Sequence, residues 1–214
     1  LYFTTGGRRT QSGLYRVRFT GKPKEESGIP ALGQSHLEAA KQSRELRRRL
    51  EVFHSEQSIE GLGLAWNNLS HDDFWIRHAA RVALENQPIK RWTLPALTES
   101  DPKRALTALM ALARVADAKG PPEVVARLND LPWERLALEW QLVALRTYQL
   151  AFIRMDAGTV YDRKSTINKI AKASGDFPET RMEVSRLMIF LNAKGMIPQL
   201  LNYVVDAKSQ EERL

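Results

Sequence analysis

Cysteine is absent from the 214 residues of this chain. Its absence excludes disulfides, thiolate nucleophiles, Cys-ligated zinc, iron–sulfur clusters and covalent c-type haem within these residues. No stretch comes near the roughly 18 uninterrupted apolar residues that a membrane-spanning helix needs, so we expect no membrane span. The 43% of residues that are hydrophobic are nevertheless enough to build a core, which predicts a folded protein.

Acidic residues are fewer than basic ones, with 25 Asp and Glu against 32 Lys and Arg and a formal net charge of +7. Such a balance is compatible with nucleic-acid binding. The excess lies early in the chain, at Arg8 and Arg9 and again from Arg44 to Arg49. Charge runs usually mark the solvated face of a helix. Because Leu46 and Leu50 take the inward side of the helix, we predict that the arginines between positions 44 and 49 lie mainly in solvent.

Strand patterns are confined to residues 1–21, which predict one β-hairpin around a Gly-rich loop. A hairpin alone is marginal in water, so we expect this one to be left over from a larger sheet. The Gly-rich loop does not end in the Gly-Lys-Ser/Thr of a phosphate loop, and strand rather than helix follows it. The alternating strand residues are Leu1, Phe3 and Thr5, then Tyr15, Val17 and Phe19.

Residues 22–34 are polar, charged and broken by Gly and Pro, which predicts a linker, and residues 35–214 are predicted to be helical. Ser35 and Glu38 have the spacing of a capping box at the first helix start. Prolines open several later helices, and Gly120, Gly175 and Gly195 lie where helices should stop. The predicted helices are near 35–54, 59–69, 73–87, 89–99, 102–117, 121–130, 133–155, 160–174, 178–193 and 196–207.

The helix predicted over 133–155 shows how these helices should pack. It carries two apolar stripes, one through Leu142 and Leu145 and one through Trp140 and Val143. A helix that is apolar over so much of its circumference is covered on more than one side. With short connections throughout, this predicts an all-α fold, an α-solenoid of antiparallel helix pairs.

Some segments resemble a known repeat. DDFWIRHAARVALEN carries Asp72, Ile76-Arg77 and a run of alanines before Leu84, and it resembles the second helix of a HEAT-type repeat. ESDPKRALTALMALARV is similar at Asp101 and in its alanines and leucines, but it departs from the pattern at the Val-Arg position. The resemblance implies HEAT-like helix pairs over 35–214.

The order of the modules resembles large multidomain proteins of planctomycetes and related bacteria, in which a sorbosone-dehydrogenase-like propeller precedes a HEAT-like array and a c-type cytochrome domain. In that comparison LYFTTGGRRTQSGLYRV is similar to the closing hairpin of the propeller. The resemblance implies a periplasmic or extracellular location, with the cytoplasm as the alternative. It implies no cofactor here, because the CxxCH haem motif needs two cysteines and the chain has none.

Residues that could carry chemistry are few. His71 and His78 are about two helical turns apart with Asp72 and Asp73 beside them, but structural zinc usually needs four ligands, and either Asp is better explained as a helix N-cap. We therefore expect no catalytic, cofactor-binding or metal-binding residue. The tryptophans, at 66, 75, 92, 133 and 140, are expected mostly in the core, with Trp133 partly exposed at a helix start.

Three functions compete. The first is a non-catalytic interaction and spacer module whose partners are neighbouring domains of the same polypeptide or other proteins. The second is nucleic-acid binding by a basic HEAT-like face, and the third, least favoured, is an enzyme. The chain is expected to be an internal fragment, with a new helix starting at Ser209 and with some residues of the last complete helix partly exposed, among Leu200, Leu201, Tyr203 and Val204. The candidate interaction residues are Arg8, Arg9, Arg44, Arg47, Arg48 and Trp133.

Overall fold

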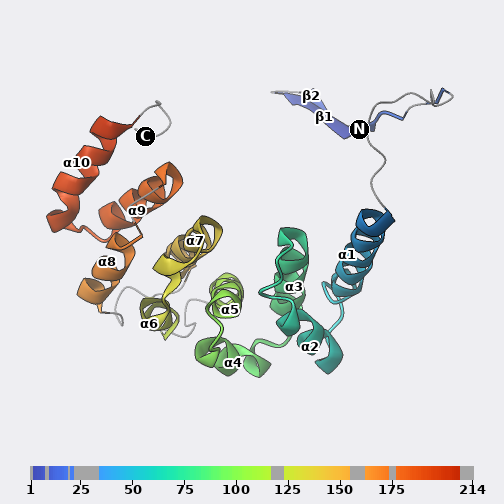
Figure 1. Cartoon of the computed structure of the whole chain (residues 1–214), viewed down its shortest axis with the longest axis horizontal. Helices are drawn as coiled ribbons and strands as arrows, with labels where there is room; N and C mark the ends of the chain where they lie inside the picture. The colour runs from blue at the N-terminus through green and yellow to red at the C-terminus, as the bar shows by residue number, and fades with distance from the viewer. Residues whose placement is uncertain are drawn as a thin grey trace. The chain divides into compact units, whose positions relative to one another are not determined.

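The computed structural model describes residues 2–7, 10–18, 20–21, 34–116, 123–154, 162–173 and 177–207. Two compact units make up the chain, Leu1–Glu38 and Ala39–Leu214. The described residues form one two-stranded hairpin and ten α-helices, which confirms the prediction of a mostly helical chain with a hairpin in front (Figure 1). Except for Gln34, the predicted linker lies outside the described residues, as do Arg8 and Arg9.

The hairpin pairs β1 (Tyr2–Gly7) with β2 (Thr10–Arg16) in antiparallel register, with an irregularity between Thr5 and Gly7. Phe3 lies opposite Tyr15, and their rings stack with centroids 5.3 Å apart. The second strand lies earlier than predicted, because Val17 follows it rather than lying inside it. The larger sheet to which the hairpin would belong stays a prediction.

Each of the ten helices predicted over residues 35–207 has a counterpart in the structure. A short 3-10 turn precedes three of them: Ile89–Arg91 precedes α4, Lys194–Met196 precedes α10, and Trp133–Arg135 precedes α7, which therefore starts five residues after its predicted start. The helices are α1 (Gln34–Val52), α2 (Ile59–Asn67), α3 (Phe74–Asn86), α4 (Thr93–Thr98), α5 (Pro102–Val115), α6 (Glu123–Asp130), α7 (Leu138–Arg154), α8 (Arg163–Ala171), α9 (Pro178–Phe190) and α10 (Ile197–Asp206).

Several helix starts follow the predicted chemistry. The carboxylates of Asp73 and Asp101 accept the first free backbone N–H groups of α3 and α5, as N-caps do. The capping box at Ser35 is wrong, because α1 begins at Gln34 and Ser35 lies inside it. The predicted stop at Gly195 is also wrong: α9 ends earlier, where Asn192 takes the left-handed conformation with φ 48°.

The helices of the second unit form two rows. Helices α3, α5, α7 and α9, here called the odd row, contact one another in chain order. Helices α4, α6 and α8 do the same, and each of α2, α4, α6 and α8 contacts the odd-row helix that follows it (Figure 1). The core therefore lies between the rows and between successive helices within them.

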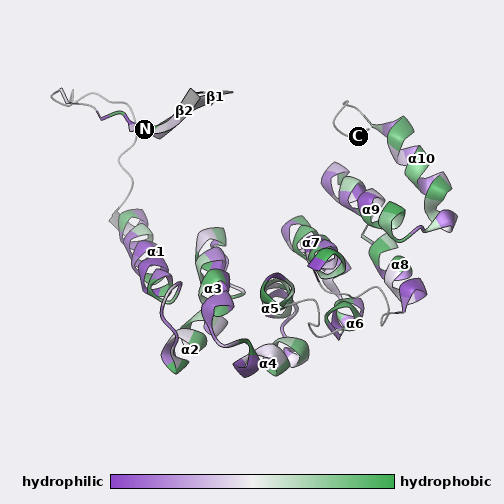
Figure 2. Cartoon of the chain, turned by 180° about the vertical axis from the view of Figure 1, so that it is seen from behind, coloured by the Kyte–Doolittle hydropathy of each residue, from purple (hydrophilic) through white to green (hydrophobic). Residues whose placement is uncertain are grey.

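Small side chains dominate the middle of the odd row. Helix α5 buries Ala105, Ala108, Ala111 and Ala113 with hardly any exposed surface, and Figure 2 shows the apolar character of this helix. Alanine lets helix axes approach closely and loses little conformational entropy in a helix. At the other end, Leu201 and Val204 of α10 are exposed, as predicted, whereas residues 208–214 lie outside the described part of the chain.

The joint between α1 and α2 depends on one glycine. Gly61 lies in the first turn of α2, where its N–H donates to the N-cap hydroxyl of Ser58, and it is buried. A Cβ at this position would collide with the ring of Phe53. In the same helix, a Cβ at Gly63 would meet no atom within 4 Å. The first glycine is thus required by packing and the second is not.

Alanine at these two positions should have opposite effects. Gly61→Ala should lower the free energy of unfolding by about 1–3 kcal/mol, because the Phe53 ring must move out of a packed site. Gly63→Ala should raise it by about 0.5–1 kcal/mol, because alanine is the better helix former. Urea denaturation followed by circular dichroism measures both, and equal stability of the two variants would show that Phe53 does not restrict this joint.

Candidate interaction surface

The described arginines of the predicted basic run lie in solvent, as expected. Arg44 and Arg48 are exposed, and Arg47 is partly exposed with an ion pair to Glu51 at 3.1 Å on the same helix. An ion pair this exposed contributes little to stability. These side chains therefore form an open basic edge of α1 rather than a pocket.

Trp133 is not a surface residue, which corrects its place among the candidate interaction residues. Its ring is completely buried, and its indole N–H donates to the carbonyl of Leu128 at 2.9 Å. The reason is the 3-10 turn before α7, which folds the ring back onto the end of α6. Trp92 and Trp140 are buried as expected, whereas Trp75 is 63% exposed, so its predicted place in the core is wrong.

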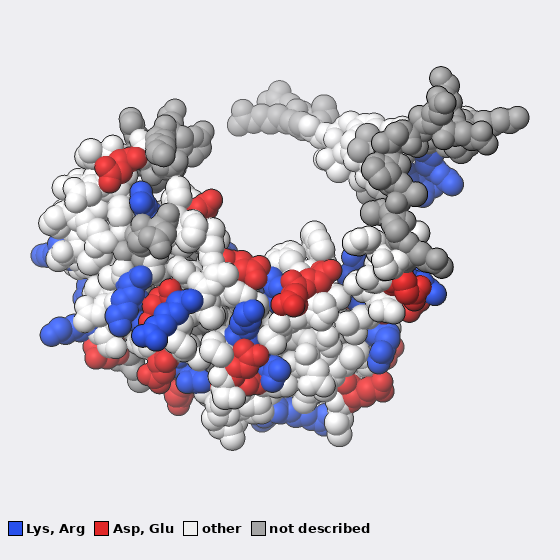
Figure 3. Space-filling model, in the orientation of Figure 1, with Lys and Arg blue, Asp and Glu red and all other residues white. Residues whose placement is uncertain are grey.

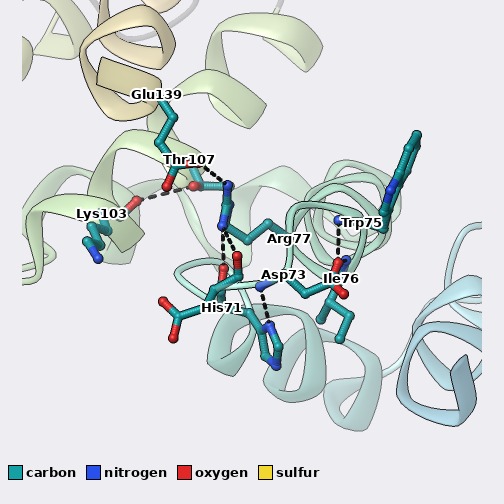
Figure 4. Close-up of polar contacts among 9 residues, drawn as sticks. His71, Asp73, Trp75, Ile76, Arg77, Lys103, Thr107 and Glu139 are labelled. Carbon is teal, nitrogen blue, oxygen red and sulfur yellow. Dashed lines mark hydrogen bonds and ion pairs between the residues drawn. The ribbon is translucent and has the colours of Figure 1, made fainter. Parts of the chain in front are cut away.

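Arg77 of α3 is the most connected buried charge among the described residues (Figure 4). One guanidinium nitrogen donates to the carbonyls of His71 and Asp72, at 2.7 and 2.8 Å, and the other donates to a carboxylate oxygen of Glu139 at 3.1 Å. The first two bonds fix the turn before α3, and the third reaches α7. Arg77 therefore holds a loop and a distant helix at once.

Aromatic rings complete the surroundings of this arginine. The guanidinium carbon lies 4.8 Å from the centroid of the Trp140 ring, and the ammonium of Lys103 lies 5.6 Å from the same ring. Cations over an indole face are attracted by its quadrupole. Trp140 thus accepts two cations, one from α3 and one from α5, and serves as a joint between three helices of the odd row.

His71 and His78 could share a helix face only if the helix began before His71, and α3 begins at Phe74. The Nδ1 atom of His71 accepts the backbone N–H of Asp73 at 2.9 Å, which stabilises the turn. Burial and the nearby Arg81 lower the pKa of His78. No group of three or more His, Asp or Glu in the described ranges could hold a metal ion.

A second polar joint lies between α6, α7 and α8. Lys169 pairs with Glu134 at 2.7 Å, and both side chains are nearly buried. Burial alone would raise the pKa of Glu134, but the bond to Lys169, a bond from its own backbone N–H and the charges of Lys169 and Lys172 together lower it. Beside this pair, the hydroxyl of Tyr148 donates to Asn129 at 2.8 Å, and burial raises the pKa of Tyr148.

Polar side chains also bridge the seams of the odd row. At the α3–α5 seam, Glu85 accepts from Arg81 of its own helix and from Arg114 of α5, the latter at 2.8 Å. Burial lowers the pKa of Arg81, although Glu85 beside it opposes this shift. This seam is therefore closed by a carboxylate between two guanidinium groups.

The α7–α9 seam is built differently. Arg146 donates to the amide of Gln149 at 2.9 Å, Gln149 donates to Glu183 of α9, and Arg186 donates to the same carboxylate at 2.7 Å. Two adjoining hollows, of about 280 and 230 Å³, lie along this seam. We call them the α7–α9 groove. Its lining residues are Leu142, Arg146, Gln149, Phe152, Ile153, Glu183, Arg186, Leu187 and Phe190.

The sequence alone did not identify this groove. Along α7, Arg146, Gln149 and Ile153 follow one another at steps of three and four residues. Glu183, Arg186 and Phe190 do the same along α9, so each set can be placed on one helix face. The pairing of the two faces joins Gln149 and Glu183, which are 34 residues apart. That pairing follows from the packing of α7 against α9.

Comparisons of the chain with protein-family models, curated proteins and solved structures find no match. The resemblance to HEAT-like arrays and to propeller-associated multidomain proteins therefore stays a prediction. None of the described helices combines the length and apolarity that a membrane crossing needs.

Removing Arg77 should cost far more stability than removing its carboxylate partner. Arg77→Met should lower the free energy of unfolding by about 2–3 kcal/mol, because two carbonyls of a tight turn lose a charged donor. Glu139→Gln should lower it by less than about 0.5 kcal/mol, because the Glu139 side chain is 57% exposed and water replaces the pair. Urea titration measures the free energy of unfolding of both variants. Equal losses would show that Arg77 stabilises the fold through its ion pair rather than through its bonds to the turn.

The Glu134–Lys169 pair should make the free energy of unfolding depend on pH in the acidic range. Because the folded state lowers the pKa of Glu134, the pair's contribution is present above the unfolded pKa, about 4.3, and is lost as pH falls through the folded value. The free energy of unfolding of the wild type should therefore fall more steeply than that of Glu134→Gln below about pH 4.3. Urea titrations at several pH values compare the two proteins, and parallel pH profiles would contradict the assignment.

Proposed function

We propose that this chain is a non-catalytic interaction and spacer module built as an α-solenoid of HEAT-like helix pairs. Its partners would be neighbouring domains of the same polypeptide or other proteins. In the setting that the sequence resemblance implies, it would keep a propeller and an electron-transfer domain in fixed relation in an extracytoplasmic protein.

The observation that carries the proposal is the use of buried polar side chains. Among the described residues, each polar residue that is buried as a whole forms at least one bond with the protein itself. Gln87, for example, donates to the carbonyl of Glu56 at 2.9 Å and accepts the N–H of Ser58 at 2.9 Å, which ties α3 to the turn before α2. Arg77, Gln87 and Lys169 join separate parts of the fold in this way, whereas the buried threonines donate to carbonyls of their own helix or of its start. The set comprises Arg77, Gln87, Thr107, Thr147, Thr166, Lys169 and Thr180.

The row arrangement supports the solenoid part of the proposal. Contacts of the odd row pass from each helix to the next, and a second row follows the same order. Stacked repeats that contact only their neighbours have this pattern, and they present extended surfaces for binding. The seams of the odd row differ in chemistry, with carboxylate and guanidinium groups at α3–α5 and a partly apolar groove at α7–α9.

Nucleic-acid binding is the alternative, and the exposed arginines of α1 are the observation that favours it. Arg44 and Arg48 are open to solvent, and phosphate contacts by such residues need no pocket. Against it stands the distribution of charge: Figure 3 shows acidic and basic side chains interspersed on the face that it displays, which offers no continuous basic track.

Two binding measurements separate these functions. In the first, fluorescence anisotropy follows a labelled 20-base-pair DNA duplex at increasing NaCl concentrations. We expect no sub-micromolar binding near physiological salt, and an Arg44→Glu/Arg48→Glu variant should behave like the wild type. In the second, a display library of random 12-residue peptides is selected against the full chain. We expect enrichment of peptides that compete with one another.

Sub-micromolar DNA binding that weakens steeply with salt and is lost in the arginine variant would establish the alternative instead. A library that shows no enrichment over the bare matrix would contradict the interaction module.

A further inference from the structure

The α7–α9 groove combines an apolar end with a cationic end. Phe152 and Phe190 stack with ring centroids 5.3 Å apart, and beside them Ile153 and Phe190 are 75% and 60% exposed. Toward the start of both helices, the lining changes to Arg146 and Arg186. An exposed apolar patch with a polar rim is typical of a binding site.

The charge at the cationic end is not balanced by the groove itself. Two guanidinium groups face one carboxylate, Glu183, which already accepts bonds from Gln149 and Arg186. Arg146 itself donates to the neutral amide of Gln149, at 2.9 Å. A guanidinium has five N–H donors, and a carboxylate would make stronger, charge-assisted bonds to it than an amide does.

The size of the groove indicates what kind of ligand it takes. The larger hollow, about 280 Å³, is slightly smaller than the roughly 300–1,000 Å³ of sites for drug-sized molecules, so it suits individual side chains. Between Leu142 and Ile153 the helix rises about 16 Å. An extended peptide of about five residues spans the same length.

From these observations we propose that the α7–α9 groove binds a short peptide segment of a protein partner, in which an acidic side chain lies within about two residues of an aromatic or aliphatic one. The acidic side chain bonds to Arg146 and Arg186, and the apolar side chain packs against Phe190 and Ile153. This assignment rests on the proposed interaction function and specifies which side chains the partner presents.

Peptides enriched from the display library test the proposal. We expect them to share an acidic residue next to an apolar one. The most enriched peptide is then synthesised with a fluorescein label and an amidated C-terminus, so that only side chains supply carboxylates, and its affinity for the full chain is measured by anisotropy.

Two substitutions change the groove at exposed positions. Arg146→Glu should weaken binding by about tenfold or more, because it replaces an attraction with a repulsion. Ile153→Ser should weaken it by about fivefold through lost apolar contact. A peptide with lysine in place of the acidic residue should bind Arg146→Glu better than it binds the wild type. That reversal is expected only if the two charges meet directly.

Matched controls exist elsewhere on the chain. Arg91→Glu changes the net charge by the same amount at an exposed site, and Ile59→Ser removes an isoleucine that is 78% exposed. Both controls should bind the peptide within about twofold of the wild type, and circular dichroism with urea titration verifies that all variants fold. Arg146→Gln, which keeps a polar side chain, should fall between the wild type and Arg146→Glu.

Each result has a distinct meaning. Enriched peptides that lack acidic residues, or that bind the groove variants as well as they bind the controls, overturn the groove assignment but leave the interaction function standing. Loss of binding on amidation shows that a C-terminal carboxylate is the ligand and overturns the assignment to an internal acidic side chain. No enrichment at all contradicts both the groove and the proposed function.

Discussion

Close packing along the odd row is the constraint on which the other features depend. Helix α5 touches α3, α4, α6 and α7, so most of its circumference must be apolar and small. Ala105, Ala108 and Ala111 meet that requirement, because a methyl group allows near contact of helix backbones. Long charged side chains do not fit between such closely packed backbones, and Arg81, Glu85 and Arg114 lie beside the alanines of the α3–α5 seam.

At the margins of the helix interfaces, long polar side chains form bonds between helices, which alanine cannot do. Arg77 reaches past its own helix pair to Glu139 and Trp140, and Lys169 reaches from α8 to Glu134. Both side chains are largely buried, and each is paired with a carboxylate, which offsets part of the cost of burying its charge. The margins also face solvent, so the same residue types that join helices are available at the α7–α9 seam to meet a ligand.

Sequence signals at helix starts predicted the helices well, because Asp at an N-cap and Pro at the first helical position act within a few residues. They failed where tertiary packing decides. Proline before Trp133 is compatible with a 3-10 turn as well as with a helix start, and burial of the indole selects the turn. Trp75 precedes the buried Ile76 by one residue, which is about 100° around the helix, and so it points outward. The groove could not be predicted, because no sequence pattern states which face of α9 meets α7.

The bonds of Arg77 differ in how far apart along the chain their partners lie. His71 and Asp72 precede it closely, so these bonds can form as soon as α3 does, whereas Glu139 lies 62 residues further on. On the ribosome, where chains emerge from the N-terminus, the turn before α3 is therefore set early. The guanidinium of Arg77 can pack against the Trp140 ring only after α7, which carries Trp140, has been synthesised. The first helices can fold as they emerge, but this joint closes only when α7, the last of its three helices, has been made.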